Sequence, residues 1–545
     1  MNSVSHQSND LFAGARQWGD APRFFLPAGE GYTAVSWQQY ADDVRALGGF
    51  LTRRIALDDK VAILGQTSYA WIVAYSAVQS VRGVVVPIYP ASKGDLIAYF
   101  LEHSDAKVLC CDQAFLGELA GIDLAGIEEI ILLDADAGVA GFKVPVYGQA
   151  EALSLGLEHR AAFESALAGV SEADLATIIY TSGTTGLPKG VMLTHANLAA
   201  SAADWISLNG PMIPDEAVDL HWLPLAHAFG IGAIMLGNRL GWQSYFATPK
   251  NVLEKFKDVR PHTFLSVPAF WEKLYLAIQT AGGNVPAFDK VTGGRLVFGL
   301  SGGAGLKKEI KQGFHEMGLL VIEGYGLTEC SPTLTMNRRE RFNFDSVGVP
   351  YPSVLIKLAE DGEILAQGPN IFKGYFKNPE ATAEAFDTAG WFKTGDVGMW
   401  TPDGFLRIID RKKEILVTSG GKNVPPANIE HKFQDNPLIQ HLIVYGDGKK
   451  YLTALVTLNE EAVRDALGDQ GTPWDALARS QKVLELVERQ VADVNESLAS
   501  YETIKKVWIS PAPLTVEDNL LTSSFKPRRK AIYEHYGAEL EALYG

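Results

Sequence analysis

The sequence is short of cysteine, and this scarcity excludes one broad class of protein. Three cysteines occur in 545 residues, at Cys110, Cys111 and Cys330. An odd number with two adjacent members does not suit a disulfide framework and fits a reducing compartment. Residues 1–12 are polar, carry Asp10 and contain no apolar core, so no signal peptide is visible. We therefore expect a cytoplasmic protein.

An excess of positive charge is also missing. The chain carries 48 Lys and Arg residues against 64 Asp and Glu residues, which gives a formal net charge of −16. This acidic balance argues against nucleic acid as a general partner and against an anionic membrane surface, although a local basic patch can still bind phosphates. A peripheral membrane contact is left open.

One uncharged window, residues 61–81, has about the length of a membrane span. It also contains polar and turn-forming residues, namely Gly65, Gln66, Thr67, Ser68, Gln79 and Ser80. A strand at 61–64, a turn, a helix at 69–81 and a further strand at 84–86 explain the window better. We expect a soluble βαβ unit here and no transmembrane segment.

The chain is too long for a single hydrophobic core, so two or more domains are expected. Helix and strand patterns alternate from residue 37 to about 120 and again after residue 199, which predicts two α/β subdomains with mostly parallel sheets. From residue 354 the apolar pattern changes to period two and predicts a small antiparallel sheet or barrel. A hairpin at 442–458 and an amphipathic helix at 483–498 follow.

A loop rich in small polar residues lies between two apolar runs in residues 178–197. Its glycines let backbone N–H groups converge, its hydroxyls add donors and Lys189 adds a positive charge, a combination that suits a polyphosphate. The common P-loop is excluded because Gly190 and an apolar run follow Lys189. A surface hairpin is the plain alternative. The candidate residues are Thr181, Ser182, Gly183, Thr184, Thr185, Gly186 and Lys189.

A second candidate site occupies residues 321–332. Gly324 and Gly326 flank Tyr325, so the backbone can turn sharply and offer the tyrosine ring to a planar base. Thr328 and Glu329 follow within reach of phosphates and Mg²⁺. The structural alternative is a buried strand that ends in a capped turn.

These motifs resemble, in the same order, signatures of the AMP-forming acyl-CoA synthetases, a group of adenylate-forming ligases that includes the luciferases. Five motifs match, and the resemblance covers nearly the whole chain. It implies that Tyr325 stacks on adenine, that Thr328 contacts the α-phosphate and that Glu329 holds Mg²⁺ together with Thr184. The segment with Gly302 and Gly303 would line the adenine and acyl pocket, and Gly326 would belong with Tyr325 to the nucleotide site.

The resemblance also assigns residues of the C-terminal third. Asp396 would bind the ribose, Arg411 the ribose and phosphates, and Lys413 would be the pivot between a large and a small domain. A turn aspartate and a charged surface turn are the plain alternatives. Together with the patterns above, this predicts an α/β fold. A large domain at 1–410, with two α/β subdomains and a small β-barrel, would precede a small mobile α+β domain at 411–545.

Two further segments complete the family pattern. Gly420 and Gly421 would line the channel for the thiol acceptor, although such a loop could simply join two elements. Lys526 falls at the position of the adenylation lysine, whereas its basic neighbourhood alone would indicate a solvated patch. Arg528, Arg529 and Lys530 then need no special role.

Residues 221–230 resemble the acid-pocket motif of the long-chain fatty acyl members, and the resemblance assigns Trp222, His227 and Gly230 to the acyl pocket. Small residues in this region leave room for an apolar tunnel, although packing between helices could demand them equally; they are Ala228, Gly230, Gly232 and Ala233. We favour a medium-to-long-chain fatty acid over an aryl acid.

The expected activity is that of an acid–thiol ligase that uses ATP, Mg²⁺ and coenzyme A to form acyl-AMP and then acyl-CoA. Three alternatives stay open. A fatty acyl-AMP ligase would deliver its acyl group to a carrier protein, an aryl-CoA ligase would take another acid, and a non-catalytic relative would only bind adenylate. A homodimer is compatible with the family and is not indicated by any segment.

Overall fold

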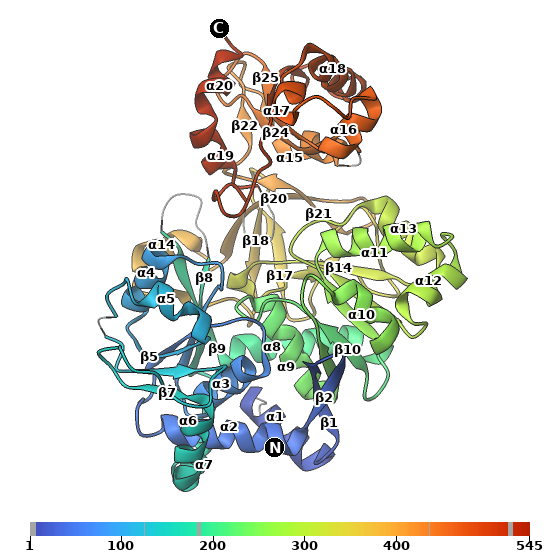
Figure 1. Cartoon of the computed structure of the whole chain (residues 1–545). Helices are drawn as coiled ribbons and strands as arrows, with labels where there is room; N and C mark the ends of the chain where they lie inside the picture. The colour runs from blue at the N-terminus through green and yellow to red at the C-terminus, as the bar shows by residue number, and fades with distance from the viewer. Residues whose placement is uncertain (1–6, 125, 182–186, 435, 522–526) are drawn as a thin grey trace. The chain divides into compact units, whose positions relative to one another are not determined.

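The computed structural model describes residues 7–124, 126–181, 187–434, 436–521 and 527–545 (Figure 1). The chain forms two compact units. The first comprises residues 1–357, 365–394 and 400–407, and the second comprises 358–364, 395–399 and 408–545. Two short segments upstream of residue 408 thus belong to the second unit, and the division at residue 410 stays a prediction.

An eight-stranded sheet in the first unit has the order β19-β9-β8-β4-β3-β5-β6-β7. Neighbouring strands from β8 to β7 are parallel, whereas β9 is antiparallel to both β8 and β19. The strands are β3 (Lys60–Leu64), β4 (Val84–Ile88), β5 (Ala106–Cys111), β6 (Glu129–Leu132), β7 (Val146–Gly148), β8 (Leu175–Thr181), β9 (Lys189–Thr194) and β19 (Gly374–Tyr375).

The window at residues 61–81 is a βαβ unit, as predicted. β3 is followed by the helix α3 (Tyr69–Ser80), which begins after Ser68, whose side chain accepts a hydrogen bond from the Trp71 backbone N–H. Among the helices of the described residues, none combines the length and the apolar character that a membrane crossing needs.

A nine-stranded sheet, also in the first unit, has the order β16-β15-β14-β13-β12-β10-β11-β1-β2. β1 and the five strands from β11 to β14 run parallel, and the outer strands β2, β15 and β16 are antiparallel additions. The strands are β1 (Pro22–Ala28), β2 (Gly31–Ser36), β10 (Val218–His221), β11 (Gln243–Phe246), β12 (Thr263–Ser266), β13 (Phe298–Ser301), β14 (Val321–Tyr325), β15 (Thr335–Met336) and β16 (Val349–Pro350).

Helices accompany both sheets, so the two predicted α/β subdomains are present (Figure 1). In addition to α3, they are α1 (Gln7–Trp18), α2 (Trp37–Leu51), α4 (Gly94–Ser104), α5 (Leu116–Leu119), α6 (Gln149–Gly156), α7 (Arg160–Ala168), α8 (His195–Asn209), α9 (Ala228–Leu240), α10 (Val252–Val259), α11 (Pro268–Thr280), α12 (Val285–Thr292), α13 (Lys308–Glu316) and α14 (Pro379–Ala385).

A small sheet follows where the period-two pattern predicted one. Its order is β17-β18-β20-β21, with strands β17 (Leu355–Leu358), β18 (Glu363–Gln367), β20 (Phe392–Trp400) and β21 (Leu406–Arg411). The two short segments that belong to the second unit begin or end within these strands.

The second unit has the predicted α+β character. Its sheet has the order β24-β25-β26, with β24 (Ile439–Tyr445) antiparallel and β26 (Ile504–Ser510) parallel to β25 (Leu452–Leu458). The amphipathic helix α18 (Gln481–Asn495) buries Val483, Val487 and Val491, as its stripe predicted. The remaining elements are β22 (Leu416–Val417), β23 (Asn423–Val424), α15 (Pro426–Glu430), α16 (Glu460–Leu467), α17 (Trp474–Ala478), α19 (Arg529–His535) and α20 (Gly537–Ala542).

A buried arginine joins the N-terminal hairpin to the nine-stranded sheet. The guanidinium of Arg23, on β1, donates to the side chains of Asn238 and Ser244 and to the carbonyls of Ile234 and Trp242, at 2.9–3.0 Å. Burial lowers the pKa of Arg23 to about 10. The sequence patterns did not place the hairpin in this sheet, because its partner strand β11 lies some two hundred residues away along the chain.

Asp219, on β10, is buried in the same region. Burial raises the pKa of its carboxyl to about 7, while the charge of Arg23 acts in the opposite direction. Because the folded state binds a proton that the unfolded state releases above about pH 4, the stability that this proton provides is lost as the pH rises through 7.

The substitution Asp219→Asn should therefore stabilise the chain above neutral pH. Asparagine cannot ionise, so the variant should exceed wild type in free energy of unfolding by up to about 4 kcal/mol at high pH and by little near pH 4. Urea unfolding across this range measures the difference. The exposed Asp215→Asn variant serves as the control, and parallel pH profiles for wild type and Asp219→Asn would contradict the prediction.

Candidate active site

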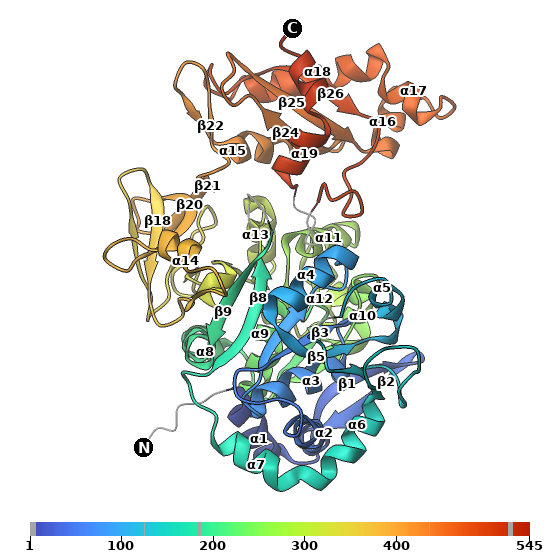
Figure 2. The same cartoon turned by 90° about the vertical axis from the view of Figure 1, so that its left-hand side faces the viewer.

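The predicted phosphate loop connects two antiparallel strands at one edge of the eight-stranded sheet (Figure 2). Thr181 is the last residue of β8, Lys189 is the first of β9, and the two are paired across the strands. The strand on each side of the loop is thus present as predicted. Ser182, Gly183, Thr184, Thr185 and Gly186 lie outside the described residues.

Helix α4 contacts the chain on both sides of this loop. The hydroxyl of Tyr99 donates to the carbonyl of Pro188 at 2.9 Å, and His103 Nδ1 shares a hydrogen bond of 2.7 Å with the hydroxyl of Tyr180. Burial, assisted by the charge of Lys377, lowers the pKa of His103, so this imidazole stays neutral at neutral pH. Neither Tyr99 nor His103 was singled out from the sequence, because their helix carries no motif.

Lys189 and Glu329 meet at a common neighbour. Glu329 is buried in a single turn of 3₁₀ helix, Thr328–Cys330. The hydroxyl of Tyr375, on β19, donates to Glu329 Oε1 at 2.9 Å, and Lys189 Nζ lies 5.0 Å from the centre of the Tyr375 ring. The structure therefore brings the predicted phosphate lysine and the predicted magnesium carboxylate together through Tyr375, a residue that was assigned no role in the sequence analysis.

The donor set fits a magnesium ion that arrives with its nucleotide. Within the described residues, no three His, Cys, Asp or Glu side chains are grouped so that they could hold a metal ion. Protein Mg²⁺ sites of the nucleotide type use one or two carboxylates and complete the shell with phosphate oxygens and water. The buried carboxylate of Glu329 matches that pattern, whereas Thr184, the other ligand predicted from the sequence, lies outside the described residues.

The predicted adenine segments lie at the carboxyl ends of adjacent parallel strands. β13 ends at Ser301, which is paired with Glu323 of β14, so Gly302 and Tyr325 follow at the same edge of the sheet. Such an edge is where parallel α/β sheets bind ligands. Gly303 has a φ of +85°, and a Cβ at Gly326 would overlap the carbonyl oxygen of Pro332, so both positions require glycine. Thr328 is partly buried at the start of the next turn.

An apolar cavity opens in the same unit. It has about 710 Å³ of space not filled by atoms, a volume that includes open solvent. Phe229 lines this cavity and also lies against Gly302, since a Cβ on that glycine would be 3.2 Å from the ring. The lining residues include Ile179, Leu198, Ala202, Trp205, Ala228, Phe229, Ile231, Gly232, Ala233, Leu236 and Tyr351.

The three residues assigned to the acyl pocket are not among the lining residues of this cavity. His227 is an exposed N-cap of α9, and its Nδ1 accepts a hydrogen bond from the Phe229 backbone N–H. Gly230 packs so closely on Pro224 that a Cβ would overlap its carbonyl oxygen, and Trp222 packs on the Phe270 ring at 3.9 Å. The assignment of these three residues stays a prediction.

Gly232 differs from Gly230. It lines the cavity, and a Cβ at this position would meet no atom within 4 Å. Both explanations for the small residues of this segment thus hold, each at a different position. Gly230 permits close packing, whereas Gly232 leaves the cavity open.

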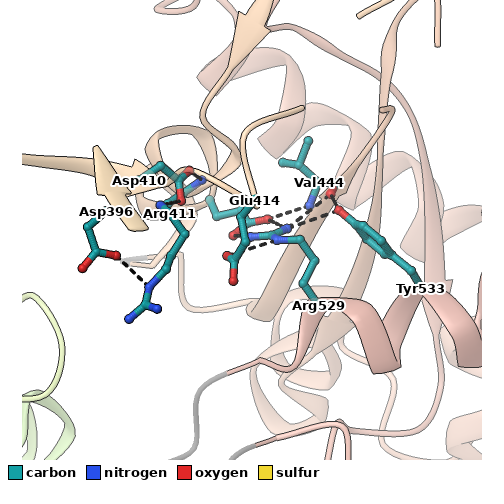
Figure 3. Close-up of polar contacts among 9 residues, drawn as sticks. Asp396, Asp410, Arg411, Glu414, Val444, Arg529 and Tyr533 are labelled. Atoms are coloured by element: carbon teal, nitrogen blue, oxygen red, sulfur yellow. Dashed lines mark hydrogen bonds and ion pairs between the residues drawn. The ribbon is translucent and has the colours of Figure 1, made fainter. Parts of the chain in front are cut away.

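In the second unit, the two predicted ribose-binding residues pair with each other. Arg411 Nε lies 2.7 Å from Oδ1 of the buried Asp396 (Figure 3). The neighbouring Asp410 is also buried and accepts from the backbone N–H groups of Arg411 and Ala427, at 2.7 and 3.0 Å. Lys413, the predicted pivot, is exposed.

Gly420 and Gly421 lie in the turn of the short hairpin β22–β23 and are exposed. Gly421 has a φ of +70°, and a Cβ there would meet no atom within 4 Å. The backbone conformation explains the glycine, and the open surroundings leave room for a ligand to approach.

Lys526 lies outside the described residues, but the helix that follows it is anchored by Arg529 (Figure 3). The guanidinium of Arg529 forms a bidentate pair with Glu430 at 2.7 and 2.8 Å and lies 3.5 Å from Glu414. Although burial alone would lower it, the carboxylate of Glu430 holds the pKa of Arg529 well above its usual value. Arg529 therefore has a structural role that its basic neighbourhood did not suggest.

The substitution Arg529→Leu should destabilise the second unit. It leaves the largely buried carboxylate of Glu430 without its partner, at a cost of about 3–5 kcal/mol. Hydrogen exchange of β24–β26 in the full chain measures the loss. The control is Lys530→Leu, which removes only an exposed ion pair with Glu534 and should change stability by less than about 1 kcal/mol. Equal effects of the two variants would contradict the prediction.

Comparison with known proteins agrees with this geometry. The family model of the AMP-binding enzymes matches residues 11–376, and the model of an AMP-binding enzyme C-terminal domain matches residues 413–545. The chain is 31% identical to the long-chain-fatty-acid–CoA ligase FadD15 of Mycobacterium tuberculosis, over 94% of this chain and 92% of the relative. It is 28% identical to the long-chain-fatty-acid–CoA ligase 5 of Rattus norvegicus, over 94% of this chain and 84% of the relative.

Solved structures share the fold. One is the A domain of a carboxylic acid reductase from Segniliparus rugosus in complex with AMP and a co-purified carboxylic acid. It matches with a TM-score of 0.80 at 22% identity, and the match covers 100% of this chain and 95% of that structure's chain. ATP-bound MatB from Rhodopseudomonas palustris has a TM-score of 0.73 at 24% identity, over 98% and 99% of the two chains. These likenesses confirm the predicted fold class, and with the family match over residues 11–376 the chain belongs to the AMP-binding enzymes.

Proposed function

We propose that this enzyme converts a medium-to-long-chain fatty acid to acyl-AMP with ATP and then transfers the acyl group to coenzyme A. The observation that carries this proposal is the apolar cavity that meets the nucleotide-facing segment at Phe229 and Gly302. An acyl chain in the cavity would place its carboxylate near the strand ends where the phosphates are expected. Relatives that align along nearly the whole chain are named as long-chain-fatty-acid–CoA ligases.

In the first half-reaction, a carboxylate oxygen attacks the α-phosphorus of ATP and pyrophosphate leaves. We assign the loop from Thr181 to Lys189 to the departing phosphates, Thr328 to the α-phosphate and Tyr325 to the adenine ring. Charge stabilisation and positioning supply most of the catalysis in such a transfer. Glu329 and Thr184 would hold Mg²⁺, which neutralises phosphate charge when bound.

The second unit contributes residues to both half-reactions in this proposal. Asp396 and Arg411 would exchange part of their mutual ion pair for the ribose and phosphates. We assign Lys526 to the carboxylate and phosphate charge of the first step and Gly420 and Gly421 to coenzyme A in the second, with Lys413 as the pivot. In that second step the thiol sulfur attacks the acyl carbonyl carbon and AMP leaves.

A cytoplasmic location belongs to the same proposal. All three cysteines are buried and free, which suits a reducing compartment. A homodimer, a peripheral membrane contact and a carrier protein as an alternative acceptor are compatible with this enzyme class, and purified protein can test each one.

The proposed activity is tested by AMP release from ATP across a panel of saturated fatty acids and benzoates, with and without coenzyme A. We expect release with one window of fatty chain lengths, accelerated by coenzyme A. Acyl-adenylate that accumulates whether or not coenzyme A is added would favour transfer to a carrier protein. Faster AMP release with benzoates than with fatty acids would favour an aryl acid as substrate. No AMP release with any acid would contradict the proposal.

The cavity predicts how chain length is selected. A Cβ at Gly232 would meet no atom within 4 Å, so the side chain of a Gly232→Phe variant should enter the cavity. We expect this variant to lower kcat/KM for palmitate by at least about tenfold while octanoate is much less affected. Gly232→Ala is the matched control and should fall between the variant and wild type. An unchanged ratio between the two acids would show that the chain binds elsewhere.

A further inference from the structure

We propose that Tyr375 is a positioning residue that sets the Glu329 carboxylate and the Lys189 ammonium for Mg²⁺–ATP. The inference rests on the proposed function, since it assumes that these two groups face the nucleotide. Its starting point is one side chain that contacts both groups in different ways. The hydroxyl donates to Glu329 at 2.9 Å, and the ring lies 5.0 Å from Lys189 Nζ.

Backbone pairing holds Tyr375 between its two partners. β19 pairs with β9 so that Tyr375 lies opposite Val191, two residues after Lys189. On the other side, the backbone N–H of Phe372 donates to the carbonyl of Glu329 at 2.8 Å. One short segment of chain is thus hydrogen-bonded both to the strand that leaves the phosphate loop and to the turn that carries the predicted magnesium ligand.

The tyrosine itself is held firmly. Its backbone N–H donates to Thr382 Oγ1 at 2.9 Å, and its ring packs edge-on against Phe372 at 4.9 Å. The preceding Gly374 has a φ of +138°, and a Cβ there would lie 2.7 Å from Thr382 Cγ2, so the backbone can take this path only with glycine. A donor that is already fixed loses little further freedom when it orients a carboxylate.

The two contacts have complementary electrostatic effects. A neutral phenol hydroxyl stabilises the Glu329 carboxylate in one orientation through a charge-assisted hydrogen bond. The electron-rich face of the same ring attracts the Lys189 ammonium. Tyr375 therefore holds an anion for the metal and a cation for the phosphates without adding a net charge to the site.

The variant Tyr375→Phe tests the hydroxyl and keeps the ring. Losing a hydrogen bond to a charged group should raise the Mg²⁺ concentration for half-maximal ATP–pyrophosphate exchange about tenfold, while kcat at saturating Mg²⁺ changes less. Binding of Mn²⁺ in the presence of ATP, followed by electron paramagnetic resonance, should weaken to the same degree. Tyr375→Leu, which also removes the ring from Lys189, should in addition raise the KM for ATP at saturating Mg²⁺.

Tyr32→Phe is the matched control, because within the described part of the chain the buried Tyr32 hydroxyl has no hydrogen-bond partner. This variant should leave both metal readouts unchanged. Wild-type Mg²⁺ dependence together with wild-type Mn²⁺ binding in Tyr375→Phe would overturn the inference. If wild type catalyses no exchange with any acid, the proposed function fails, whereas Mn²⁺ binding in the presence of ATP still decides the role of Tyr375.

Discussion

The reversal of chain direction between β8 and β9 is the constraint on which the first unit's candidate site depends. Every neighbouring pair from β8 to β7 is parallel, so a continued crossover pattern would carry the chain away from this edge. The antiparallel return instead brings Thr181 and Lys189 opposite each other and creates a new edge, to which β19 adds. Because β19 carries Tyr375, a residue far away in the sequence lies close to Lys189.

In the proposed function, the parallel strands of the nine-stranded sheet position the segments assigned to adenine and to the acid. Parallel neighbours end at a common edge, so Gly302, directly after β13, and Tyr325, at the end of β14, lie at the same edge of the sheet. Phe229 reaches Gly302 from the helix that lines the apolar cavity. The strand order, rather than any single motif, makes these segments neighbours, and the proposed function places the acid and the nucleotide at this one edge.

Sequence reasoning succeeded where a pattern reports local structure. The alternation of strands and helices, the flanks of the phosphate loop and the stripe of α18 follow from periodicity and turn chemistry. It could not show that Arg23 ties β1 to a distant strand, that Gly230 serves packing while Gly232 faces a cavity, or that Arg529 is an anchor. Each of these depends on a contact between segments far apart in the chain, which local patterns do not encode.

The charged groups assigned to ligands already have partners in the structure. Arg411 pairs with Asp396, and Tyr375 contacts both Glu329 and Lys189. A buried charge without a partner is costly, so the pairs stabilise the site before a ligand arrives. In the proposed function, nucleotide binding would exchange one set of partners for another, and the affinity would depend on how well phosphate and ribose oxygens replace the protein's own groups. By the same proposal, a residue that orients these charges, such as Tyr375, would influence affinity without touching the substrate.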